Sequence, residues 1–218
     1  STILIWLIAF PIGFYSATHK YSFGDYAFTG ISFFGVSVPE FLLAILIMYL
    51  YFLVTRKYAG GLYSDVYAGK PWTWDKIVDM LKHVWIPLLV IAITGTAGLF
   101  KTFRANLLDE LGKPYVKTAR AKGVSNMRLL IKYPVRIALI PFIATVGWML
   151  PGLISGQTVL SMVLSLPTVG PLLITALQNQ DMYLAGSIVF VMGLMAMIGT
   201  LVSDILLAVT DPRIRNSM

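Results

Sequence analysis

Long stretches without a single charged side chain constrain this chain more than any other feature of its sequence. Residues 137–180 are 44 consecutive positions without Asp, Glu, Lys or Arg, and residues 182–203 add a further 22. About 20 apolar residues in a helix cross the hydrocarbon core of a bilayer. The stretches therefore predict helices that cross a membrane, because a helix on the surface of a soluble domain carries charged residues on its outer face.

The overall composition supports the same class of fold. Only 12% of the 218 residues are charged and 57% are hydrophobic, whereas an ordinary soluble domain has about 25% charged residues. A transmembrane β-barrel would show ~10-residue segments of alternating polarity, and the apolar stretches here are continuous. We therefore predict an all-α fold, a polytopic bundle of transmembrane helices.

Five apolar blocks define the expected crossings within one domain that spans residues 1–218. The blocks are residues 1–18, 26–54, 84–103, 137–160 and 182–208. Beyond the fourth block, the stretch Ser165–Pro171 holds two prolines and a glycine and should break the helix. A short helix, Leu172–Gln178, should follow at or within the membrane, where irregular backbone must be buried in protein or line a water-filled path. Because the chain opens directly in an apolar block, we expect residue 1 to lie inside a longer protein.

Basic residues set the expected orientation. The segment 101–136 holds nine basic residues against two acidic ones. Since Lys and Arg accumulate in cytoplasmic loops, residues 104–136 and the C-terminal tail are expected in the cytoplasm. The segment from Ser161 to Tyr183 has neither Lys nor Arg and is expected outside. Residues 56–83 are then also external, and their five basic residues are outweighed by the denser segment 101–136.

The expected cytoplasmic loop contains a patterned segment, residues 115–132, which we call the elbow. Tyr115–Lys122 is composed of good helix formers, and Gly123 stands where helices often end in a left-handed residue. Ser125 or Asn126 can cap a second helix. The pattern predicts a helix–glycine–helix unit whose small side chains let another protein approach closely.

The nine residues Tyr115-Val-Lys-Thr-Ala-Arg-Ala-Lys-Gly123 resemble the coupling loop of the first permease subunit of oligopeptide and dipeptide ABC importers. Leu166-Pro167, Gly170, Asp181 and the closing Asp211-Pro-Arg-Ile-Arg215 are similar to the same family in order and spacing. The resemblance implies a type I ABC importer permease fold whose first helix precedes residue 1. It also implies a set of ATPase-coupling residues: Tyr115, Thr118, Ala119, Arg120, Ala121, Lys122, Gly123, Val124 and Ser125.

A second set of residues is expected along the translocation path. Glu40 follows Pro39 inside an apolar block, and an acid within a membrane is a functional candidate by default. Alternatively, backbone donors that Pro39 leaves free hold the Glu40 carboxylate for a structural purpose. The expected path residues are Glu40, Ser161, Ser165, Thr168 and Gln178.

The resemblance also implies partners and a location. The chain would be a multi-pass subunit of a bacterial or archaeal cell (inner) membrane, with its C-terminus in the cytoplasm. It would work with a second homologous permease subunit, two ATPase subunits, an extracytoplasmic solute-binding protein and membrane lipid, and with no nucleic acid. ATP and Mg would be bound and ATP hydrolysed by the ATPase subunits, so this chain would hold no cofactor or metal of its own.

Other substrates and other classes of protein stay open as alternatives. Ser161, Thr168 and Pro171 stand where the family often has Glu, Gly and Arg, so nickel chelates and oligosaccharides remain alternatives to peptides. A secondary transporter would need buried ionisable groups for ion coupling, and only Glu40 qualifies. An intramembrane enzyme is disfavoured, because the sequence has no cysteine and both histidines lie outside the apolar blocks.

The orientation can be tested because the sequence has no cysteine. Single cysteines at Ser125 and at Gln178 would be exposed to a membrane-impermeant thiol reagent on intact cells. We expect labelling at position 178 and none at position 125. Labelling at position 125 but not at 178 would reverse the predicted orientation.

Overall fold

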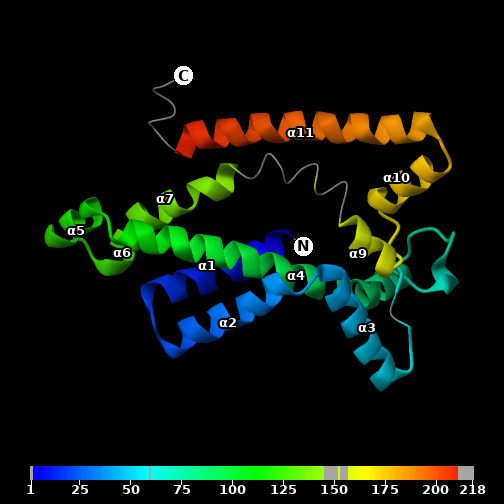
Figure 1. Ribbon diagram of the computed structural model, residues 1–218, viewed down its shortest axis with the longest axis horizontal. Helices are drawn as coiled ribbons and strands as arrows, with labels where there is room; N and C mark the ends of the chain where they lie inside the picture. The colour runs from blue at the N-terminus through cyan, green and yellow to red at the C-terminus, as the bar shows by residue number, and fades with distance from the viewer. Residues whose placement is uncertain (1, 59, 145–151, 153–156, 211–218) are drawn as a thin grey trace. The chain divides into compact units, whose positions relative to one another are not determined.

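The structure is a computed structural model that describes residues 2–58, 60–144, 152 and 157–210. Throughout these ranges the regular elements are helices (Figure 1), which confirms the all-α fold. The helices are α1 Thr2–Thr18, α2 Phe23–Ser37, α3 Glu40–Thr55, α4 Trp74–Leu111, α5 Pro114–Ala121, α6 Asn126–Leu130, α7 Arg136–Ala138, α9 Thr158–Val163, α10 Val169–Gln178 and α11 Met182–Thr210. A 3₁₀ turn, Asp65–Tyr67, precedes α4, and a π-helical turn, Ile131–Val135, joins α6 to α7.

Two helices of the described part, α4 and α11, are long and apolar enough to cross a membrane. The helix α4 extends the expected segment 84–103 at both ends, because no residue between Trp74 and Leu111 stops it, and Pro87 is accommodated inside the helix. The pair α2–α3 counts as a third candidate, bent by 101° at its break. Proline lacks a backbone N–H and disfavours helix at the preceding residue, so Pro39 divides the expected segment 26–54 into two helices. Much of the expected crossing 137–160 lies outside the described residues.

The chain divides into two compact units. Unit 1 comprises Ser1–Ser37, Ala92–Gly147 and Thr200–Met218, and unit 2 comprises Val38–Ile91 and Trp148–Gly199. The helices α4 and α11 each contribute residues to both units. The elbow belongs to unit 1, and the segments 56–83 and 161–183 belong to unit 2.

Unit 1 is built around three phenylalanines from three segments. The ring centroids of Phe10 and Phe103 are 5.0 Å apart, and Phe142 lies 5.6 Å from Phe10 and 6.0 Å from Phe103. All three pairs meet edge to face, an arrangement that aromatic quadrupoles favour. Phe103 and the neighbouring Leu107 are almost completely buried, so the C-terminal half of α4 is the centre of this core.

Two glycines bring α1 and α2 close to α4 within unit 1. A Cβ atom on Gly13 of α1 would lie 2.8 Å from the ring of Phe103. On Gly35 of α2 it would lie 2.8 Å from the Cβ of Ala97 and 3.2 Å from the carbonyl oxygen of Ile93. Small residues at helix contacts let backbones approach closely in membrane bundles, and these two positions have no room for a side chain.

In unit 2 the segment between α3 and α4 is held by polar contacts. The backbone N–H and the hydroxyl of Ser64 both donate to the Asp79 carboxylate, at 2.6 and 2.9 Å. Lys76, which is only 4% exposed, lies with its ammonium 4.3 Å from the Tyr63 ring centroid and 5.0 Å from that of Trp72. Buried charges need such compensation, so this segment is ordered around Lys76.

The close approach at Gly35 predicts a position-specific loss of stability. Gly35→Ala should lower the free energy of unfolding by about 1–3 kcal/mol, because the added Cβ overlaps Ala97 and the α4 backbone. Gly30→Ala on the same helix is the matched control, since no atom lies within 4 Å of its added Cβ. Thermal unfolding of the purified protein in detergent would measure both. Equal melting temperatures for the two variants would contradict the packing described here.

Candidate functional site

The elbow forms a structured unit in which glycine ends the first helix. The helix α5 starts with Pro114 in its first turn, after Lys113 in an extended conformation. At its end Gly123 has φ +78° and its N–H donates to the Arg120 carbonyl (3.0 Å), while the N–H of Val124 donates to the Ala119 carbonyl (3.3 Å). This pair of bonds is a Schellman-type helix end, which favours glycine. The predicted helix–glycine–helix shape is therefore confirmed.

The second helix begins where the sequence predicts, but the predicted side-chain cap is not formed. Ser125 occupies the N-cap position of α6 but makes no side-chain capping hydrogen bond. The helix widens after Leu130 into the π-helical turn that contains Pro134. Proline has no N–H to give to the helical ladder, so a wider turn at this point accommodates it.

The two helices of the elbow share a small hydrophobic core of their own. Val116, Ala119 and Leu129 are buried there, and the partly buried Tyr115, Val124, Leu130 and Tyr133 pack around them. Ala119 thus differs from its expected place on the outer surface, because its small side chain lets α5 lie close to α6 inside the elbow. The remaining expected coupling residues are exposed: Thr118, Arg120, Ala121, Lys122, Gly123 and Ser125.

A tyrosine ties the elbow to the end of α4. The Tyr115 hydroxyl donates to Glu110 Oε2 at 2.5 Å. Desolvation by burial and the adjacent Glu110 carboxylate both raise the pKa of the Tyr115 phenol above its ordinary value. The phenol therefore stays protonated, and able to donate, throughout the neutral pH range. Together with the short link Gly112–Lys113, this bond makes the elbow an extension of α4.

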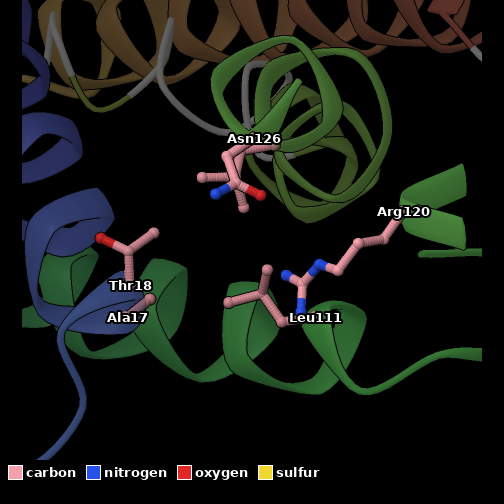
Figure 2. A pocket seen from close by; sticks show the side chains of 6 residues that line it. Ala17, Thr18, Leu111, Arg120 and Asn126 are labelled. Atoms are coloured by element: carbon pink, nitrogen blue, oxygen red, sulfur yellow. The ribbon is translucent and has the colours of Figure 1, made fainter. Parts of the chain in front are cut away.

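A cavity of about 550 Å³ lies on the side of the elbow that faces α1 and α4. Figure 2 shows the Arg120 side chain of α5 reaching Leu111 of α4, with Asn126 of α6 and Thr18 of α1 on other sides of the space. Neither the Arg120 guanidinium nor the Asn126 amide has a side-chain partner in the described part of the chain. Both side chains line the cavity.

Unit 1 also contains an ion pair that the sequence did not predict, with a buried carboxylate, Asp25, and a partly buried guanidinium, Arg104. Arg104 donates from Nε to Asp25 Oδ1 (2.6 Å) and from Nη2 to Asp25 Oδ2 (2.7 Å). Asp25 is 2% exposed and also accepts from the Ser16 hydroxyl. In the sequence, Arg104 is one of the nine basic residues that predict the orientation of the chain, and Asp25 lies just before the apolar block 26–54. No local pattern links two residues that are 79 positions apart in the sequence.

The expected path residues all belong to unit 2, and Glu40, the first residue of α3, contacts the N-cap residue of α9. Its Oε1 accepts a hydrogen bond from Gln157 Nε2 at 2.7 Å. Beside this pair is a cavity of about 320 Å³, which Phe41 and residues 157–160 also line. Ser161 lies one turn further along α9 and is buried. The structure thus brings the Glu40 carboxylate of α3 to the beginning of the short helix that carries Ser161.

The predicted break is confirmed, since α9 ends at Val163 and α10 begins at Val169. The other residues expected along the path lie in or near this break. Ser165 has φ +55° and follows the last turn of α9, with its hydroxyl 3.4 Å from that of Tyr58. The short helix α10 begins at Val169, three residues earlier than expected, and Gln178 is exposed at its end. The Thr168 hydroxyl is buried and has no partner among the described residues.

Comparison with known proteins shows to which family the chain belongs. Residues 9–216 match the family model described as a binding-protein-dependent transport system inner membrane component. The chain belongs to this family. This match covers the elbow, the break between α9 and α10, and both long apolar helices.

The sequence similarity to individual relatives extends over nearly the whole chain. The oligopeptide transport system permease protein AppB of Bacillus subtilis is 35% identical over 215 residues, which are 98% of this chain and 66% of that protein. OppB, an oligopeptide permease protein of Mycobacterium bovis, is 29% identical over 94% of this chain and 65% of its own length. DppB, a dipeptide permease protein of Escherichia coli, is 27% identical over 96% and 66%. The chain thus spans about two thirds of the length of these relatives.

The left-handed conformation at Gly123 predicts how this family member tolerates substitution in its elbow. Gly123→Val should destabilise the elbow by roughly 1–2 kcal/mol, because a β-branched residue disfavours positive φ. A clash is not the cause, since no atom lies within 4 Å of an added Cβ. Gly123→Asn should cost less, because asparagine tolerates this conformation.

Amide hydrogen exchange of residues 115–130 would measure the effect. Protection in the Val variant should fall by a factor of roughly 5–30, which corresponds to that loss of free energy. Equal protection in the Val and Asn variants would show that backbone conformation does not limit the elbow.

Proposed function

We propose that the chain is the transmembrane permease subunit of an ATP-driven, binding-protein-dependent ABC importer for oligopeptides or dipeptides. The observation that carries the proposal is the elbow, a self-contained helix–glycine–helix unit bonded to the end of a long apolar helix. Membership of the inner-membrane component family supports the class of importer, and the similarity to oligopeptide and dipeptide permease proteins supports the class of substrate.

In this proposal the elbow receives the movement of a partner ATPase. Its own core and the Tyr115–Glu110 hydrogen bond let it move as one body with the end of α4. Its exposed residues, including Arg120, form the surface that enters a groove on the ATPase. Two such ATPases bind ATP and Mg and carry out hydrolysis, while a second permease subunit completes the pore.

The outer side of the path is assigned to unit 2. Glu40 and Gln157 present a polar pair beside a cavity, and the irregular segment between α9 and α10 is the kind of backbone that membrane proteins keep in protein-lined or water-filled places. An extracytoplasmic solute-binding protein delivers the substrate on this side. Nickel chelates and oligosaccharides are the alternative cargoes, and ligand-binding measurements on the solute-binding protein would distinguish them from peptides.

A bulky residue on the elbow surface should test the function. Ala121 is exposed, so Ala121→Trp should leave the elbow folded but obstruct docking of the ATPase. We expect ATPase co-purification and substrate-stimulated hydrolysis to fall in reconstituted vesicles, together with uptake. Ala121→Ser is the matched control and should behave as wild type, because it adds little volume at the same position.

Association of the two permease subunits should be unchanged in both variants, which separates docking from folding. Normal uptake and normal hydrolysis in the Trp variant would mean that the elbow is not the coupling surface, and the importer proposal would lose its main support.

A further inference from the structure

We propose that the Asp25–Arg104 ion pair is the positioning contact that makes the α1–α2 hairpin move together with the elbow. This inference rests on the proposed function and concerns how motion received by the elbow reaches other helices.

The pair fixes both distance and orientation. Arg104 donates to both oxygens of Asp25, and each oxygen accepts a second bond, Oδ1 from the Ser16 hydroxyl and Oδ2 from the Tyr21 N–H. Arg104 Nε also lies 3.0 Å from the Ser16 hydroxyl oxygen. Two parallel bonds between a planar guanidinium and a carboxylate permit neither rotation nor sliding without being broken.

The groups of this contact come from the turn of the hairpin and from α4. Ser16 is in the last turn of α1, Tyr21 is in the connection, and Asp25 is in the first turn of α2. Arg104 lies on α4, seven positions before its end at Leu111. The contact therefore joins the α1–α2 turn to the helix that carries the elbow.

An unbroken helix links the contact to the elbow. Residues 104–111 are helical throughout, and Glu110, near the end of this stretch, accepts the Tyr115 hydrogen bond. A displacement of the elbow is thus passed through the Tyr115–Glu110 bond and less than three turns of α4 to Arg104. From there the bidentate pair passes it to α1 and α2 together.

Stability alone gives no reason for a charge pair here. The neighbouring core of Ala17, Phe103 and Leu107 already packs α1 against α4, and a buried ion pair is often no more stabilising than apolar residues of similar volume. Apolar contacts, however, hold surfaces together without fixing their register. The ion pair therefore supplies a defined register between the hairpin and α4.

Two variants separate register from stability. Arg104→Lys keeps the charge but loses the bidentate geometry, and the double variant Asp25→Leu/Arg104→Met replaces the pair by apolar groups without leaving a buried charge unpaired. Phe103→Leu is the matched control, since it weakens the adjacent core and leaves the ion pair in place. All are made in the full-length protein within its complete complex.

The functional readout is the number of ATP molecules consumed per substrate imported into vesicles. We expect this ratio to rise roughly tenfold in the Arg104→Lys and double variants, within the usual range of coupling between sites. In Phe103→Leu the melting temperature should fall while the ratio stays at the wild-type value. A wild-type ratio in both ion-pair variants would overturn the proposal.

A distance measurement tests the same contact without relying on transport. Spin labels at the exposed Lys20 in the hairpin turn and Asp109 on α4 report the register directly. The distance distribution should be narrow and equal with and without ATP in the wild type and in Phe103→Leu, and broad in both ion-pair variants. Narrow distributions in the ion-pair variants would overturn the proposal, whereas an absence of ATP-driven uptake in the wild type would contradict only the proposed function.

Discussion

The bidentate contact between Arg104 and Asp25 is the polar interaction on which the arrangement of unit 1 depends. A carboxylate that is 2% exposed is stable as an anion only where hydrogen bonds and an opposite charge replace its lost hydration. Arg104, Ser16 and the Tyr21 N–H together provide this replacement. Their simultaneous engagement requires the end of α1, the start of α2 and the C-terminal half of α4 to meet at one point. The phenylalanine core packs around the same part of α4.

The elbow does not depend on this ion pair, because contacts within the elbow determine its shape. Gly123 supplies the positive φ that ends α5, and Ala119 is small enough to let α5 pack on Leu129 of α6. The Tyr115–Glu110 bond then converts a local unit into a continuation of α4. Rigidity of this kind suits a part that receives movement from a partner, since a flexible connector would absorb the displacement.

Elements whose conformation depends on residues nearby in the sequence could be predicted from the sequence. The elbow, the break near Pro167 and the short helix that ends at Gln178 each follow from glycine, proline or helix-forming residues within a few positions. The bend at Pro39 had a local cause as well, but the apolar block around it concealed two helices. The inward position of Ala119 was not predictable from its size, because a small residue serves equally well in an elbow core and on a contact surface.

The sequence by itself determined that this is a helical membrane protein with a glycine-ended elbow, because continuous apolar blocks and backbone preferences act over short distances along the chain. Only the tertiary structure decided which polar groups meet. The pairing of Asp25 with Arg104 and the hydrogen bond between Glu40 and Gln157 join residues 79 and 117 positions apart. Which partner a buried charge finds depends on how helices pack, and helix packing depends on all the contacting side chains together. No short stretch of sequence carries that information.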